Sequence, residues 1–85
     1  MGKTITSPGH RALIKAMTDA RKAACVTQAD LARILGCQQS LIARIESGQR
    51  RIDAVDIVRW ARAVGAQAKQ LIDVVEQATP PETSG

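Results

Sequence analysis

The chain has 85 residues, twelve of them Lys or Arg against eight Asp or Glu, and its net charge of +4 fits one small basic domain. The charge favours an anionic partner, with nucleic acid first and a membrane surface second, although a solvated basic surface is the plain alternative. No apolar run approaches a membrane span and nothing resembles a signal peptide, so we expect a cytoplasmic protein without a membrane partner.

The first predicted helix runs from about Pro8 to Ala24. Ser7 precedes it as an N-cap, and a proline suits the first turn of a helix. Apolar residues recur at helical spacing and predict one buried face. That face is formed by Leu13, Met17, Ala20 and Ala24. Residues 1–6 have no periodic pattern, so we expect a flexible N-terminus there.

The stretch from Thr27 to Gly48 holds two short amphipathic segments joined by a turn at Gly36. Thr27 is placed to cap the first segment, and Asp30 stands where a capping box has its carboxylate. Gly36 falls where the first helix must stop, at a position that usually needs a positive φ. Two helices this short, joined by about three residues around a glycine, cross steeply, which is the helix-turn-helix geometry.

Two further helices complete the predicted domain, which covers residues 7–79. Asp53 caps the fourth helix, which ends at Gly65, and the fifth helix covers residues 67–78. Two prolines stop the fifth helix, so residues 80–85 are expected to be a disordered tail. With no Phe or Tyr and one Trp, the core must be built from Ala, Leu, Ile and Val, which favours an all-α fold of closely packed helices.

The apolar residues of the fifth predicted helix span roughly 160° of the helical wheel, more than one small core needs. The surplus predicts a second contact surface on this helix, and we expect it to form a homodimer. The residues expected in that interface are Leu71, Val74 and Ala78. Docking of a different protein on the same face is the alternative.

The residues of the central motif resemble a known family. The pattern Thr-Gln-x-x-Leu-Ala-x-x-Leu-Gly, then Gln-Ser-x-Ile-x-x-Ile-Glu-x-Gly, is similar to that of the Cro/CI-type (XRE) helix-turn-helix repressors, and the likeness continues to Gly65. It implies a five-helix lambda-repressor-like fold and a sequence-specific regulator of transcription, expected to repress. By the same resemblance a dimer binds an inverted-repeat operator in double-stranded DNA. The resemblance also implies a bacterial or phage-encoded protein associated with the nucleoid.

The second helix of the motif, opening at Cys37 or Gln38, is the one that such proteins insert into the major groove. Ile42 and Ile45 must face inward, which leaves a polar face toward DNA. The residues predicted to contact bases are Gln38, Gln39, Ser40, Ala43 and Arg44. Glutamine pairs bidentately with adenine and arginine with guanine, whereas an alanine methyl contacts that of thymine. Leu41 replaces a polar residue common in the family, and it either contacts a methyl group or lies at the edge of the core.

Phosphate contacts are predicted at two places around this second helix. Thr27 and Gln28 begin the first helix of the motif, where backbone amides and the helix dipole favour a phosphate. By resemblance, the side chain of Gln28 also braces Gln39. Arg50 and Arg51 follow the second helix and are well placed to reach phosphates.

Two side chains outside the polar face of the motif are assigned structural roles. The resemblance implies that Arg21, in the first helix, forms an ion pair with Glu46 near the end of the second helix of the motif. The alternative for Arg21 is a solvated side chain on the helix surface. Trp60 is interpreted as a core residue rather than a base-stacking platform, because the family has leucine there and single aromatics at helical spacing usually pack.

The sequence offers little for catalysis or metal binding. It has no nucleophile–base pair, paired carboxylates, phosphate-cradling glycine loop or cofactor motif, so we expect neither an enzyme nor a cofactor. Cys25 and Cys37 lack metal-ligand spacing and His10 is the single histidine, so no metal site is expected. Both thiols are expected to be buried or half-buried. The alternative function is an antitoxin-like module that binds a partner protein and represses its own operon.

Overall fold

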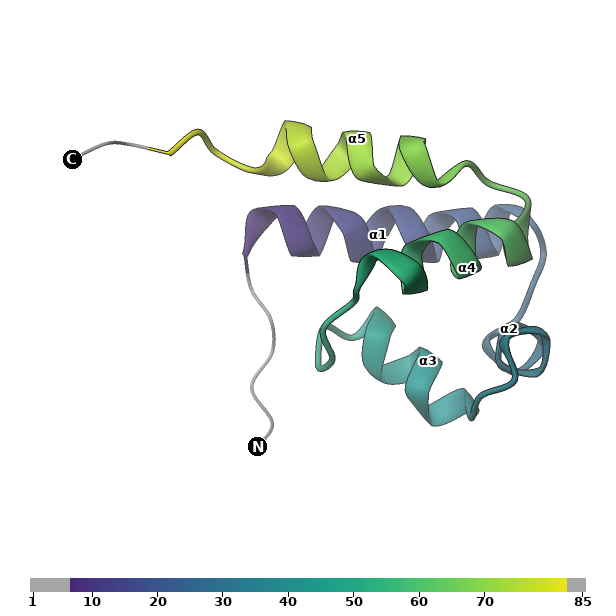
Figure 1. Ribbon diagram of the computed structural model, residues 1–85. Coiled ribbons are helices and arrows are strands. Elements are labelled where there is room, and N and C mark those ends of the chain that lie inside the picture. The colour runs from purple at the N-terminus through teal and green to yellow at the C-terminus, as the bar shows by residue number, and fades with distance from the viewer. Residues whose placement is uncertain (1–6, 83–85) are drawn as a thin grey trace.

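The computed structural model describes residues 7–82, which form five helices and no strand in that range. The helices are α1 (Pro8–Ala23), α2 (Gln28–Leu35), α3 (Gln39–Glu46), α4 (Ala54–Val64) and α5 (Ala68–Ala78) (Figure 1). The predicted all-α class and the order of the helices are confirmed. The expectations for residues 1–6 and for the end of the tail, residues 83–85, lie outside the described residues. Residues 80–82 have no regular secondary structure.

Helix α1 lies at the centre of the arrangement. It contacts α3, α4 and α5, and α5 runs along it on the side away from α2 and α3 (Figure 1). Helices α2 and α3 pack on each other, and α4 contacts both α1 and α2. Within the described range, no helix has the length and apolar character needed to cross a membrane.

Local capping fixes where α2, the first helix of the motif, and α4 begin. The Thr27 hydroxyl accepts from the backbone N–H of Asp30 at 3.0 Å, and Asp30 Oδ2 accepts from the N–H of Thr27 at 3.3 Å. The same reciprocal capping box joins Asp53 and Asp56 at the start of α4. Gly36 then ends α2 with φ +70°, the left-handed conformation that glycine adopts without a steric penalty. These short-range contacts therefore set the predicted boundaries of the helix-turn-helix.

The core is formed by one cluster of buried apolar side chains drawn from all five helices. Its members are Leu13, Met17, Leu31, Ala32, Ile42, Ile45, Ile57, Trp60, Ala61 and Leu71. Trp60 is only 1% exposed, and its indole Nε1 donates to the carbonyl oxygen of Met17 at 2.9 Å. The interpretation of Trp60 as a core residue is therefore confirmed, and its single polar atom is satisfied by α1.

The buried face of α1 differs from the predicted one at its C-terminal end. The buried positions are Gly9, Leu13, Met17 and Arg21, four residues apart. Ala24, which was expected on this face, is exposed, and Ala20 is only half-buried. The helix ends at Ala23, and the chain then turns away through Cys25, whose φ is +59°. The last turn of α1 thus buries Arg21, whereas the expected burial of Ala24 is not seen.

The two cysteines are free thiols in different surroundings. Cys37 is half-buried, as expected, in the turn between α2 and α3. The expected burial of Cys25 is wrong, because this residue occupies the left-handed position just after α1 and its side chain is exposed.

The expected dimer residues on α5 do not share one environment. Leu71 is 4% exposed and belongs to the core of the protomer, so little of its side chain is left for a surface interface, and its place in a dimer stays a prediction. It is buried because α5 packs along α1. Val74 and Ala78 are half-buried, whereas Ile72 on the same helix is 45% exposed.

Two opposite substitutions test the backbone strain at the left-handed positions. Gly36→Ala should lower the free energy of unfolding by about 1–2 kcal/mol, the cost of a left-handed residue that carries a Cβ. A methyl group at Gly36 would meet no other atom within 4 Å, so the cost is backbone strain alone. Cys25→Gly relieves the same strain and should raise stability by up to about 1 kcal/mol, because the extra freedom of glycine in the unfolded chain offsets part of the gain.

Thermal melts of the two variants and the native chain provide the measurement. Shifts of the same sign in both variants would contradict this assignment of strain.

Candidate nucleic-acid interface

Helix α3 has a buried face and an exposed polar face on opposite sides. Ile42 and Ile45 are 1% and 4% exposed and anchor the helix in the core. Of the residues predicted to contact bases, Ala43 is half-buried and the others are exposed, namely Gln38, Gln39, Ser40 and Arg44. The N-terminus of α3 carries three of these polar side chains in succession, with Gln38 as the residue that precedes the helix. The structure thus gathers the predicted base-contacting residues on one accessible face.

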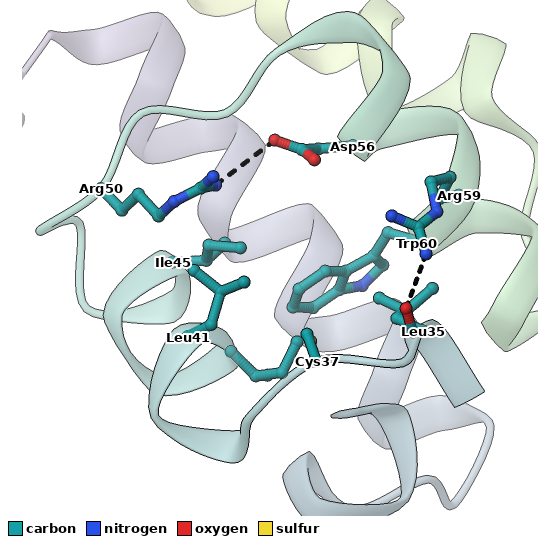
Figure 2. A pocket seen from close by; sticks show the side chains of 9 residues that line it. Leu35, Cys37, Leu41, Ile45, Arg50, Asp56, Arg59 and Trp60 are labelled. Carbon is teal, nitrogen blue, oxygen red and sulfur yellow. Dashed lines mark hydrogen bonds and ion pairs between the residues drawn. The ribbon is translucent and has the colours of Figure 1, made fainter. Parts of the chain in front are cut away.

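Leu41 belongs to the edge of the core. It is half-buried and packs against the buried cluster, and it lines an open depression with Trp60 and Cys37 (Figure 2). Of the two roles that the sequence left open for this residue, the structure shows packing at the edge of the core.

A buried polar network ties α3 to α1. Arg21 Nε donates to Glu46 Oε2 at 2.6 Å, and Arg21 Nη2 donates to Glu46 Oε1 at 3.0 Å. Both side chains are only 9% exposed. The remaining guanidinium nitrogen, Nη1, donates to the carbonyl oxygen of Val26 at 2.8 Å. The hydrogen bonds to Glu46 raise the pKa of Arg21 above its ordinary value despite its burial, so this arginine stays charged.

Gln28 extends the same network to α2. Its side-chain Nε2 donates to Glu46 Oε1 at 2.9 Å. The resemblance implied a contact between Gln28 and Gln39, and the structure instead pairs Gln28 with Glu46. The Glu46 carboxylate accepts from α1 and α2 together, so one side chain near the end of α3 fixes two other helices. Gln28 therefore holds the start of α2 against the end of α3.

The start of α2 is already occupied by its own capping groups. Thr27 is exposed, and its hydroxyl accepts from the N–H of Asp30. Hydrogen bonds with Thr27, and then the guanidinium of Arg33 at 3.0 Å, lower the pKa of the Asp30 carboxyl. A phosphate placed at this helix end would therefore meet backbone amides beside an ionised carboxylate.

The two adjacent arginines after α3 have different surroundings. Arg50 Nη1 lies 3.4 Å from Asp56 Oδ2 in an ion pair (Figure 2). It also donates to the carbonyl oxygen of Arg51 at 3.2 Å. The side chain of Arg51 is exposed and has no ion pair within residues 7–82. The positive charge of Arg51 reaches His10, whose pKa is lowered first by burial and then by that charge. Arg51 therefore faces a neutral histidine rather than a carboxylate.

The open depression beside α3 is bounded by α2, α3 and α4 (Figure 2). Its lining is mainly apolar, and the Arg50–Asp56 pair stands at its rim. At another edge, Arg59 Nη2 donates to the carbonyl oxygen of Leu35 at 2.6 Å and so caps the C-terminus of α2. Neither this role of Arg59 nor the pairing of Asp56 was predicted from the sequence. The Asp53-x-x-Asp56 spacing could have marked Asp56 as a capping residue, but no local pattern marks Arg59.

Comparisons with known proteins agree with this geometry. The helix-turn-helix domain family matches residues 16–73 of the chain. A solved structure of an XRE-family like protein from Pseudomonas syringae pv. tomato str. DC3000 is 33% identical, with a TM-score of 0.76, and the match covers 85% of this chain and 88% of that one. No curated protein matches the chain.

The buried anchor and the exposed polar face of α3 define a helix-turn-helix DNA-binding protein. The chain belongs to the XRE family of these proteins.

Removal of the Glu46 carboxylate should destabilise the whole domain. Glu46→Ala leaves the Arg21 guanidinium buried without a counter-charge, which costs about 3–5 kcal/mol. Small domains have total stabilities of about 5–15 kcal/mol, so this variant should melt far below the native chain or be largely unfolded. The measurement is a thermal melt followed by circular dichroism.

The exposed Lys15–Asp19 pair of α1 provides the matched control. Its atoms lie 2.8 Å apart, against 2.6 Å for the Arg21–Glu46 pair, but its side chains are 78% and 59% exposed. Asp19→Ala should therefore cost no more than about 1 kcal/mol. Equal shifts of the melting temperature in Glu46→Ala and Asp19→Ala would contradict the structural role of Glu46.

Proposed function

We propose that this protein is a sequence-specific regulator of transcription that represses by binding an inverted-repeat operator as a dimer, with α3 in the major groove. The observation that carries the proposal is the division of α3 into a buried apolar face and an exposed polar one. A helix held in this way presents side chains to base edges without losing its own packing. Family membership supports the same docking geometry, in which the second helix of the motif enters the groove.

The base contacts are assigned to the exposed face of α3. Arg44 is a candidate for guanine, since a guanidinium donates two hydrogen bonds to the O6 and N7 atoms of that base. Gln38 and Gln39 suit adenine, and the half-buried methyl of Ala43 suits the methyl of thymine. Ser40 can pair with either kind of base.

The phosphate contacts are assigned to two sites that flank α3. One is the N-terminus of α2, at Thr27 and Gln28, where backbone amides rather than the Gln28 side chain are available. The other is the loop after α3, where Arg51 is exposed. Arg50 lies in the same loop but is paired with Asp56 in the free protein.

The dimer is assigned to the part of α5 that the protomer core leaves half-covered. Val74 and Ala78 are half-buried in the single chain, and a second copy would complete their burial. A two-fold dimer of this class places its two recognition helices about 34–36 Å apart, one turn of DNA.

Substitution of Arg44 and Arg51 separates base recognition from backbone binding. Arg44→Ala should cost about 1–3 kcal/mol on the preferred site and relax discrimination at one base pair per half-site, because it removes a bidentate contact. Arg51→Ala should weaken binding to all sequences alike and lower the salt slope by about one for each phosphate that the side chain no longer neutralises. In a symmetric dimer, both effects occur twice.

The measurement is the affinity for matched and mismatched duplexes over a salt series, after the preferred site has been selected from genomic DNA. If Arg44→Ala weakened every duplex equally while Arg51→Ala changed the base preference, the two roles would be reversed. If neither substitution changed the affinity for DNA, the proposed regulator would be wrong.

The dimer is tested by placing a charge on α5. Val74→Glu should weaken both self-association and binding to the operator, because a carboxylate in an apolar interface is left without a partner. Sedimentation over a range of concentrations measures the association, and circular dichroism checks that the helices remain. Ile72→Glu, on a more exposed part of α5, is the control and should leave the dimer intact. A native chain that stayed monomeric in solution and on DNA would exclude the dimer.

A further inference from the structure

An ion pair folds the loop between α3 and α4 back onto the domain. The guanidinium of Arg50 contacts Asp56 Oδ2 at 3.4 Å (Figure 2). It also donates to the carbonyl oxygen of Arg51 at 3.2 Å, and both contacts use Nη1. The pair is partly shielded from solvent, since the Arg50 side chain is 42% exposed and that of Asp56 is 27% exposed. The Arg50 side chain is thereby directed toward the first turn of α4.

Asp56 is held in place independently of Arg50. Its Oδ2 accepts from the backbone N–H of Asp53 at 3.2 Å, and its own N–H donates to Asp53 Oδ1 at 2.8 Å. A carboxylate in the first turn of a helix is also stabilised by the helix dipole. The position and charge of Asp56 therefore belong to α4, whereas Arg50 reaches the pair from the loop.

The neighbouring Arg51 has no comparable restraint. Within the described part of the chain no carboxylate pairs with it, and the titratable group that its charge affects is His10 of α1. The two arginines are adjacent in sequence and both exposed, yet within residues 7–82 one is paired with a fixed carboxylate and the other is not.

We propose that Asp56 is a positioning residue that withholds Arg50 from the DNA backbone and thereby sets the affinity and salt dependence of binding. This role rests on the proposed DNA-binding function. Asp56 holds Nη1 and directs the guanidinium of Arg50 toward α4, so a phosphate contact by Arg50 competes with this carboxylate. Arg51 makes its phosphate contact without that competition. Asp56 therefore gives the two adjacent arginines different roles. Arg50 holds the loop against α4, and Arg51 binds the DNA backbone.

The test removes the charge of Asp56 and keeps its capping hydrogen bond with Asp53. Asp56→Asn retains a side-chain oxygen that accepts from the N–H of Asp53, but it no longer holds the guanidinium by charge. Affinity for a mixed-sequence DNA duplex should rise about two- to fivefold per protomer, the range measured for partly exposed charge pairs. The slope of log affinity against log salt should steepen by about 0.9 per protomer, the value for one added phosphate contact.

Two further variants assign the effect to Arg50. Arg50→Ala in the native background should leave the salt slope nearly unchanged, because the restrained side chain makes no phosphate contact. The double variant Arg50→Ala with Asp56→Asn should lose the gain of the single Asp56→Asn variant. Asp19→Asn is the matched control, since it removes one carboxylate that is paired with Lys15 on α1 and corrects for the change in net charge.

The readouts are fluorescence anisotropy of the labelled duplex over a salt series and a thermal melt of each variant. A purely structural ion pair would lower the melting temperature of Asp56→Asn and leave its salt slope at the native value, which would overturn the proposal. The proposal would also be overturned if Asp56→Asn gained no more affinity for the duplex than Asp19→Asn, or if the double variant with Arg50→Ala kept that gain. If Asp56→Asn does not fold, Arg50→Ala in the native background provides the test. A decrease of about one in its salt slope would show that Arg50 already contacts phosphate and would overturn the proposal.

The same titrations distinguish the role of Asp56 from the function on which it rests. A native chain that binds the duplex, combined with an unresponsive Asp56→Asn variant, contradicts only the role of Asp56. A native chain that binds no duplex at low salt contradicts both.

Discussion

The carboxylate of Glu46 is the point on which the arrangement of α3 depends. It accepts hydrogen bonds from Arg21 of α1 and from Gln28 at the start of α2, while the apolar side of α3 is buried. Apolar packing alone tolerates small rotations and shifts, whereas a bidentate pair fixes direction as well as distance. The exposed face of α3 is thus held at a defined angle to the domain by side chains that are themselves largely buried.

The positions of the charged side chains bear on nucleic-acid binding more than the net charge of +4 does. Within residues 7–82, four basic side chains lie in ion pairs with carboxylates, and these are Lys15, Arg21, Arg33 and Arg50. Arg44 and Arg51 have no such partner in that range and flank the end of α3. Two of the arginines without an ion pair in that range therefore lie on α3 or directly after it, although basic residues are spread along the whole chain.

The sequence patterns predicted the features that short-range interactions determine. They failed for side chains whose partners lie far away in the chain. Capping residues and apolar spacing located the five helices and the buried side of α3. No local pattern distinguishes Arg50 from Arg51, because the difference is made by Asp56, which is used in the cap of the next helix. The partner of Gln28 likewise lies eighteen residues away. The helical wheel of α5 showed that Leu71 is hydrophobic, but not that packing along α1 covers it.

The buried indole of Trp60 gives the protein an internal optical probe. It is the only tryptophan in the sequence, it is 1% exposed, and its ring nitrogen bonds to the backbone of α1. Its emission consequently reports the docking of α4 on α1, in a position that a nucleic-acid base cannot reach. A change in that emission when DNA is added would signal a rearrangement inside the domain rather than stacking on a base, so packing and binding can be followed separately in one sample.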